Sequence, residues 1–186
     1  MKRAIFLDRD GTINVDYGFV SSPDKFELLP HAVDGLKKMA SLGFLLIIVS
    51  NQSGIGRNYY TLTDYEKVTA HMLKLLKEQC VTLDDLYYCP HSPESNCACR
   101  KPATKMLTDA IQKWDIDHAQ SFLVGDKESD IRAGIRMGLK TFLIYNKAAG
   151  VTQNEIKYGE NFCSKNLLEV AKKIEILLHQ EKAIHA

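Results

Sequence analysis

The stretch that decides the fold is AIFLDRDGTIN, residues 4–14. Its first four residues are apolar, as expected for a strand that is buried on both faces of a sheet. Two carboxylates, Asp8 and Asp10, follow this apolar run at once, with an arginine between them. Taken alone, DRDGT is equally consistent with a functional site and with a simple strand end and turn, so the rest of the chain has to decide.

Four more short apolar runs resemble this one, and longer segments with helical spacing separate them. The apolar runs cover residues 44–49, 85–89, 121–125 and 141–145. Apolar residues recur at helical intervals over residues 31–43, 61–80, 103–116, 129–138 and 164–180, and Ser164 is the expected N-cap of the last segment. Strands that alternate with helices predict right-handed crossovers, and therefore a doubly wound α/β fold with a mostly parallel sheet.

The composition indicates a single globular domain whose binding partner is a small molecule. The chain has 186 residues, 45% of them hydrophobic, and no repeat or linker, so we expect a single domain over residues 1–186. Its 24 basic and 23 acidic side chains give a net charge of +1, which argues against binding to nucleic acid or anionic lipid. The longest apolar run is too short to span a bilayer, and the N-terminus lacks the long apolar segment of a signal peptide. We therefore expect a cytoplasmic monomer.

The two carboxylates after the first strand suit a divalent cation. In open α/β sheets, ligands bind in the crevice beyond the carboxyl ends of the strands. Residues i and i+2 of an extended segment point the same way, roughly 6.5 to 7 Å apart, so Asp8 and Asp10 are expected to face one crevice. Mg²⁺, which prefers hard oxygen ligands, would relieve the repulsion between them.

Polar groups also follow two other predicted strands. SNQSGIGR, residues 50–57, offers a hydroxyl, two amides, two glycines and an arginine for an anion, and it matches neither the dinucleotide fingerprint nor the P-loop. GDKESD, residues 125–130, places Asp126 at a strand end and Asp130 four residues later, one turn away if the next helix starts early. Polar strand ends of this kind, taken together, favour a functional site.

A second cluster of chemically reactive residues begins at the end of the apolar run 85–89 and continues into the polar loop of residues 90–102. Cys89, His91, Cys97 and Cys99 supply three thiols and an imidazole within eleven residues, a set that is typical of structural zinc. The alternative is a loop with a few solvent-exposed thiols. A zinc ion with four protein ligands has no open position for substrate, so its role would be to anchor the loop of residues 89–101, which also carries Arg100 and Lys101.

FLDRDGT, VSNQ, RKP and GDKESD, in this order, resemble the four motifs of the haloacid dehalogenase (HAD) superfamily of phosphotransferases. The similarity extends from residue 1 to about residue 150 and is closest to the heptose-bisphosphate phosphatases, in the branch that also contains the histidinol-phosphate phosphatases. Its most specific matches are NVDYGFV (14–20), NQSGIGR (51–57) and YYCPH (87–91). The resemblance implies a HAD-like fold and the hydrolysis of a phosphate monoester, and the chain shows no large inserted cap domain.

The resemblance also implies roles for individual residues. Asp8 would be the nucleophile that forms an aspartyl-phosphate, and Asp10 the general acid and then the general base. Ser50 and Lys101 would bind the transferring oxygens, and Asp8, the backbone carbonyl of Asp10, and Asp126 would hold Mg²⁺. Asp130 would orient Lys101 or a metal-bound water. The residues expected to bind substrate are Asp16, Tyr17, Gly18, Phe19, Asn51, Gln52, Ser53, Arg57, Arg100 and Lys127.

The same resemblance favours a phosphosugar substrate, namely a D-glycero-D-manno-heptose 1,7-bisphosphate that is hydrolysed at the 7-position in nucleotide-activated heptose biosynthesis. Arg57 and Arg100 would suit its second phosphate, because guanidinium binds phosphate in a bidentate fork. The short loop between His91 and Cys97 is more like that of histidinol-phosphate phosphatases, which are the alternative. A non-catalytic phosphosugar-binding module would not need all four motifs. A phosphomutase or transferase would need a cap to keep water from the aspartyl-phosphate.

Overall fold

Six strands form one parallel sheet in this computed structural model, which describes residues 1–145 and 162–184. The strand order is β3-β2-β1-β4-β5-β6, and every neighbouring pair is parallel. The strands are β1 (Ala4–Leu7), β2 (Leu45–Asn51), β3 (Asp85–Cys89), β4 (Phe122–Gly125), β5 (Lys140–Ile144) and β6 (Phe162–Ser164). The first five strands confirm the apolar runs in the sequence.

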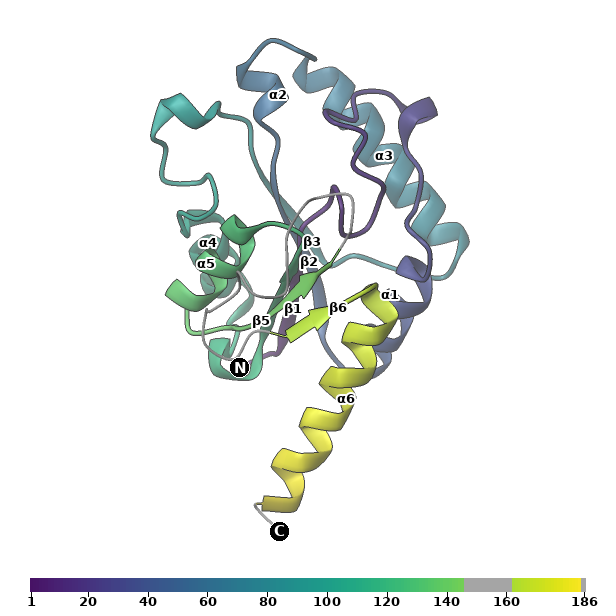
Figure 1. Cartoon of the computed structure of the whole chain (residues 1–186), viewed down its shortest axis with the longest axis vertical. Helices are drawn as coiled ribbons and strands as arrows, with labels where there is room; N and C mark the ends of the chain where they lie inside the picture. Colours follow the sequence, from purple (N-terminus) through teal and green to yellow (C-terminus); the bar gives the residue numbers. More distant parts are fainter. Residues whose placement is uncertain (146–161, 185–186) are drawn as a thin grey trace.

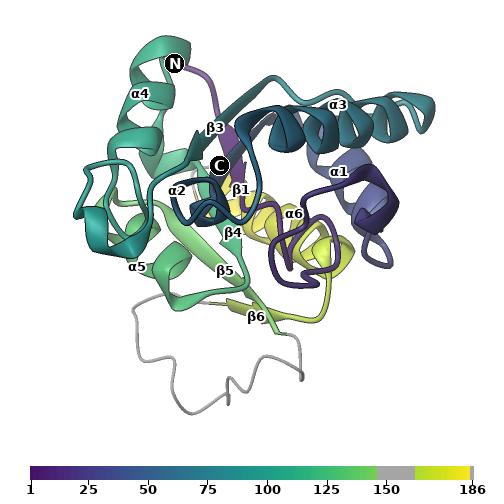
Figure 2. The ribbon, with the colours of Figure 1, turned by 90° about the horizontal axis from the view of Figure 1, so that it is seen from above.

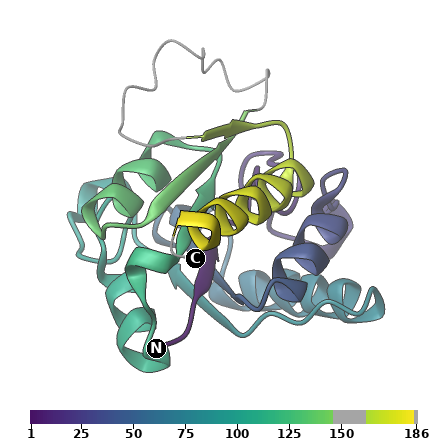
Figure 3. The same cartoon turned by 90° about the horizontal axis from the view of Figure 1, so that it is seen from below.

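Helices cover both faces of the sheet (Figures 1–3). On one face lie α1 (Ala32–Ser41), α3 (Leu62–Glu78) and α6 (Leu167–Ile184), which bury Leu36, Met72 and Ile174 in one apolar cluster. On the other face lie α4 (Lys105–Trp114) and α5 (Glu128–Arg136), which bury Leu107 and Ala133 in a second cluster. This arrangement confirms the predicted doubly wound α/β fold.

The sequence did not predict the helical turn α2, the strand β6 or the three 3-10 helices η1 (Pro23–Lys25), η2 (Pro93–Ser95) and η3 (His118–Gln120), and one cap was predicted wrongly. The helical turn α2 (Ser53–Gly56) and strand β6 have four and three residues, too few to show a periodicity. Ser164, the expected N-cap of the last helix, belongs to β6. The cap is Asn166, whose Oδ1 accepts the N–H of Glu169 at 3.0 Å.

The strand order places a crevice beside the carboxyl end of β1. The chain runs from β1 to β2 and β3 on one side and continues with β4, β5 and β6 on the other, so the direction of winding reverses between β1 and β4. In open α/β sheets, such a switch point is where ligands bind. The N–H of Asp8 donates to the carbonyl of Val124 at 2.9 Å, which brings the residues after β1 next to those after β4. Among the helices of the described residues, none has the length and apolarity to cross a membrane.

Candidate active site and metal centre

Three carboxylates and a lysine meet, buried, at this switch point. Asp8 follows β1, Asp126 follows β4, and Asp130 lies in the first turn of α5. Each offers an oxygen atom, and the three atoms lie within 4.8 Å of one another. Gly11 permits this closeness: its φ is +83°, and a Cβ there would lie 2.2 Å from Oδ2 of Asp126. The tight turn after β1 therefore needs glycine.

Lys101 neutralises part of this negative charge. Its Nζ lies 2.8 Å from Oδ1 of Asp8 and 2.6 Å from Oδ1 of Asp130, and it also donates to the carbonyl of Val49. Burial disfavours the ammonium, but the charges of Asp130 and Asp8 outweigh it and raise the pKa of Lys101. Burial alone would raise the pKa of Asp8, yet the charges of Lys101 and Lys127 hold it below its usual value. Asp8 is thus a buried carboxylate that is already ionised, as a nucleophile must be.

The chemistry of this group fits a divalent cation. Burial, followed by the charge of Asp8, raises the pKa of Asp126 to about 8, although Lys127 opposes the shift. Oδ1 of Asp126 is buried and has no hydrogen-bond partner among the described residues. A cluster of oxygen ligands with excess negative charge and an unpaired buried oxygen is what Mg²⁺ requires of a protein site.

Asp10 lies outside this group of three, and its side chain has other partners. Arg9 forks onto both of its oxygens at 2.9 to 3.2 Å, Asn14 donates to Oδ1 at 2.9 Å, and Gln52 donates to Oδ2 at 2.9 Å. That Asp8 and Asp10 face one crevice stays a prediction. The turn that follows Asp10 is closed by the carbonyl of Arg9, which accepts the N–H groups of the three residues 12–14.

Arg9 and Tyr60 are site residues that the sequence reasoning missed. Arg9 is 1% exposed and is the largest fully buried side chain of the described residues. Its position could have been used to predict this burial, because Arg9 stands between two acids at the end of an apolar strand and a buried guanidinium needs a carboxylate partner. Tyr60 donates to Oε1 of Gln52 at 2.7 Å, and burial raises the pKa of Tyr60 to about 12. Nothing in the local sequence pattern pointed to Tyr60.

The two amides after β2 contact other parts of the site. Asn51 exchanges two hydrogen bonds with the main chain of Lys101, and Gln52 donates to both Asp10 and Ser50. Ser53 begins α2, and its carbonyl accepts the N–H of Arg57. The structure therefore brings Gln52 to both Asp10 and Ser50, and Asn51 to Lys101.

Segment 14–20 is tied to the end of β4 through Lys127. Nζ of Lys127 lies 3.1 Å from Oδ2 of Asp16 and 3.7 Å from Oδ2 of Asp126, and Oδ1 of Asp16 accepts the N–H of Gly18. Tyr17 and Phe19 are about half exposed, and the ring of Phe19 packs edge-on against Tyr59 at 4.8 Å. This segment is thus an exposed rim with an aromatic surface, held next to the acidic group.

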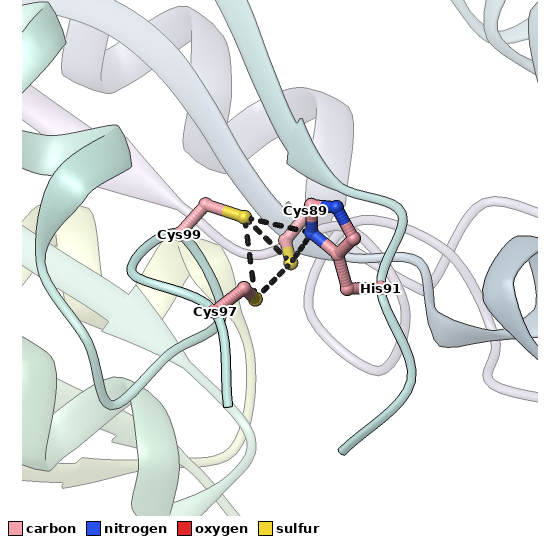
Figure 4. A group of neighbouring side chains, drawn as sticks. All are labelled: Cys89, His91, Cys97 and Cys99. Atoms are coloured by element: carbon pink, nitrogen blue, oxygen red, sulfur yellow. Dashed lines mark hydrogen bonds between the residues drawn. The ribbon is translucent and has the colours of Figure 1, made fainter. Parts of the chain in front are cut away.

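The four candidate zinc ligands converge on one point (Figure 4). The sulfur atoms of Cys89, Cys97 and Cys99 lie 2.9 to 3.4 Å apart, and Nδ1 of His91 lies 3.2 Å from Sγ of Cys99 and 3.6 Å from Sγ of Cys89. Tetrahedral zinc with Zn–S bonds of about 2.3 Å would hold its sulfur ligands about 3.8 Å apart. The cysteines are free thiols, and a small outward adjustment would admit the ion, so the residues fit zinc.

Two arginines flank this loop. Arg57 pairs with Glu94 of the loop at 3.4 Å, and the N–H of Gly56 donates to the carbonyl of Pro90 at 2.8 Å. Arg100 directly follows the ligand Cys99, and its Nη1 is buried without a hydrogen-bond partner in the part of the chain that the structure describes. Arg57 and Arg100 therefore both lie at the zinc loop, and their role toward a second phosphate stays a prediction.

A sheet of this order, with a buried aspartate after β1, a lysine paired with it and a second acid after β4, defines a HAD-like hydrolase. The family model described as HAD-hydrolase-like matches residues 98–170. The chain belongs to the heptose-1,7-bisphosphate 7-phosphatase family of these enzymes, as its curated relatives show.

The relatives and the solved structures agree. The chain is 43% identical over 170 residues to the D-glycero-β-D-manno-heptose-1,7-bisphosphate 7-phosphatase of Helicobacter pylori J99, covering 90% of this chain and 94% of that protein. It is 42% identical to the enzyme of the same name from Haemophilus influenzae, with 82% and 86% covered. The crystal structure of D,D-heptose 1,7-bisphosphate phosphatase from B. bronchiseptica, complexed with magnesium and phosphate, superposes with a TM-score of 0.87 at 28% identity. That match covers 96% of this chain and 99% of the other.

Proposed function

We propose that the protein is a Mg²⁺-dependent phosphatase that removes the 7-phosphate of D-glycero-β-D-manno-heptose 1,7-bisphosphate through an aspartyl-phosphate. The observation that carries the proposal is the buried pair of Asp8 and Lys101 at the switch point, because it holds an ionised nucleophile beside a cation. The names of the relatives support the substrate and its β anomer.

The reaction would proceed in two steps. An oxygen of Asp8 attacks phosphorus, the bond from phosphorus to the sugar oxygen breaks, and protonated Asp10 gives its proton to that oxygen. Water then gives a proton to the carboxylate of Asp10 and attacks the aspartyl-phosphate, which releases phosphate and restores Asp8. Ser50 and Lys101 hold the phosphoryl oxygens, and Asp130 keeps Lys101 in place.

Asp8, Asp126 and the backbone carbonyl of Asp10 would hold the magnesium ion. When bound, Mg²⁺ offsets the charge that a carboxylate and a phosphate dianion bring together. The orphaned Oδ1 of Asp126 supports this assignment. Removal of the ion with a chelator should stop phosphate release, and added Mg²⁺ should restore it.

We assign a structural role to zinc, and Cys97→Ser tests it. Loss of one ligand should remove about one zinc per chain and loosen the loop that carries Arg100 and Lys101. A shift of about 1 Å in a catalytic group can lower the rate on the order of 10²-fold, so kcat/KM should fall without rescue by Mg²⁺. Elemental analysis, circular dichroism and kinetics measure the three effects, and the helical signal should persist because the larger apolar cluster, which holds α1, α3 and α6 to the sheet, contains none of the four ligands.

Cys80→Ser is the matched control, since Cys80 is exposed and lies outside the candidate zinc site. It should keep both its zinc and its activity. A wild-type protein purified without chelators that contains no zinc, or a zinc-free Cys97→Ser protein with full activity, would contradict the assignment.

A panel of three phosphate esters tests the substrate. We expect kcat/KM to be highest for the β anomer of the heptose bisphosphate, lower for the α anomer, and at least about 10-fold lower for histidinol phosphate. Such discrimination needs contacts beyond the phosphate. In this proposal, the rim at Asp16, Tyr17 and Phe19 and the arginines at the zinc loop would make them. The measurement is phosphate release under identical Mg²⁺. A preference for histidinol phosphate would overturn the substrate and leave the phosphatase chemistry standing.

A further inference from the structure

The side chain of Gln52 has all of its hydrogen-bonding positions in use. It is 2% exposed. Its Oε1 accepts from the Tyr60 hydroxyl at 2.7 Å and from Nη2 of Arg9 at 3.2 Å. Its Nε2 donates to Oδ2 of Asp10 at 2.9 Å and to Oγ of Ser50 at 2.7 Å. A primary amide has two donor positions and two acceptor positions, so Gln52 has none left for a substrate.

The partners of Gln52 also determine which way its amide faces. The guanidinium of Arg9 can only donate, so the oxygen of Gln52 must lie toward it, and the NH₂ group then faces Asp10 and Ser50. Gly54 allows the Tyr60 hydroxyl to reach the amide, because a Cβ at Gly54 would lie 2.0 Å from the Tyr60 ring. Residues from three parts of the chain thus hold one amide in a single orientation.

Asn51, the neighbouring amide, is used in a different way. Its Nδ2 donates to the carbonyl of Lys101 at 3.1 Å, and its Oδ1 accepts the N–H of Lys101 at 3.0 Å. Two opposed hydrogen bonds to the N–H and the C=O of Lys101 fix both the distance and the rotation of its backbone relative to β2. The side chain of Lys101 extends from this fixed point to the Asp8 carboxylate.

We infer that Gln52 and Asn51 are positioning residues that serve opposite sides of the scissile bond: Gln52 aligns the carboxylate of Asp10 on the leaving-group side, and Asn51 aligns Lys101 on the phosphoryl side. The inference rests on the proposed function, in which Asp10 moves the proton and Lys101 binds the phosphoryl oxygens. It replaces the sequence-based expectation that both amides bind substrate.

The geometry explains why Asp10 needs a partner besides Arg9. The guanidinium of Arg9 contacts both carboxylate oxygens of Asp10. Because Arg9 is the adjacent residue in the chain, the two side chains can move together, and their contact alone does not fix Asp10 relative to the sheet. Gln52 comes from the sheet through the end of β2 and contacts Oδ2, while Asn14 contacts Oδ1. Asp10 is therefore held against the sheet itself, which gives the proton donor a defined place.

The first experiment compares Gln52→Met with the wild type on β-heptose 1,7-bisphosphate. Methionine keeps the length of the side chain and removes all four hydrogen bonds. We expect kcat to fall on the order of 10²-fold while KM stays within about threefold, because a misaligned acid slows the reaction and leaves binding intact. A rise in KM with unchanged kcat would show that Gln52 binds substrate and would overturn the inference.

A double-mutant cycle identifies the residue through which Gln52 acts. In an Asp10→Asn background, measured by single turnover, Gln52→Met should cause less than about threefold further loss, because the group that it aligns is gone. In an Asn51→Ala background it should cause its full loss, since Asn51 acts through Lys101. Equal losses of activity in the wild-type and Asp10→Asn backgrounds would overturn the inference.

Gln52→Glu covers the case in which Gln52→Met does not fold. Glutamate keeps the oxygen that Tyr60 and Arg9 contact and removes the donor that faces Asp10, so kcat should fall while KM is kept. Wild-type kcat in Gln52→Glu would refute the inference. The proposed function fails separately: activity in Asp8→Asn would refute covalent catalysis, whereas an inactive Asp8→Asn with an unaltered Gln52→Met would refute only the positioning role.

Discussion

Asp8→Asn is expected to abolish turnover, with a loss on the order of 10⁴-fold or more in kcat, and to leave the fold intact. An amide at this position cannot attack phosphorus. Asp8, Asp10 and Lys101 act as one catalytic unit in the proposed reaction, and such a unit loses most of its effect on the rate when one member is removed. The fold should persist because the change removes one of three buried negative charges, while Lys101 keeps its pairing with Asp130 at 2.6 Å.

Three measurements check this expectation. Phosphate release gives kcat, acid-quench mass spectrometry detects phosphorylated Asp8 in the wild type, and urea denaturation gives the free energy of unfolding. Asp34→Asn is the control, because Asp34 is an exposed acid on α1, and its activity should equal that of the wild type. Residual kcat in Asp8→Asn above a few per cent of the wild type would exclude Asp8 as the nucleophile.

Lys101→Met is expected to lower both stability and activity. Lys101 is 3% exposed and provides the cationic partner for two buried acids, Asp8 and Asp130. Removal of one partner from a buried ion pair destabilises a protein by about 3–5 kcal/mol, because an uncompensated charge is left in a low dielectric. The loss of a positioned donor to the phosphoryl group should also lower kcat on the order of 10²- to 10³-fold. Urea denaturation and steady-state kinetics measure the two effects.

Two further variants sharpen this test. Lys105→Met removes an exposed lysine that pairs with Asp109 at 2.9 Å, and the free energy of unfolding should change by less than about 1 kcal/mol. Adding Asp130→Asn to Lys101→Met should recover part of the lost stability, since it removes one of the uncompensated charges. If Lys101→Met were as stable as Lys105→Met, Lys101 would not be the group that balances the buried acids.

The local pattern of the sequence determined the sheet, the helices and the positions of the motifs. Five apolar runs became β1 to β5 because a strand buried on both faces must be apolar throughout, and this signal needs no partner to be recognised. The strand ends follow from the same pattern, so Asp8, Ser50 and Asp126 were located by sequence alone. The candidate zinc ligands Cys89, His91, Cys97 and Cys99 could also be recognised from the sequence, because several cysteine and histidine residues within a short loop indicate metal binding before the fold is known.

Tertiary structure alone decided which side chains meet. Asp8 and Lys101 are 93 residues apart, and their contact depends on how β1 and the loop after the zinc ligands are placed by the whole sheet. The partners of the Asp10 carboxylate, Arg9, Asn14 and Gln52, could not be predicted from the sequence, because they depend on the turn around the Arg9 carbonyl and on where the end of β2 lies. Hydrogen bonds depend on tenths of an ångström and on angle, whereas apolar patterning depends only on which face is buried. For this reason the sequence sufficed to locate the site, and only the fold could show that Asn51 and Gln52 hold Lys101 and Asp10.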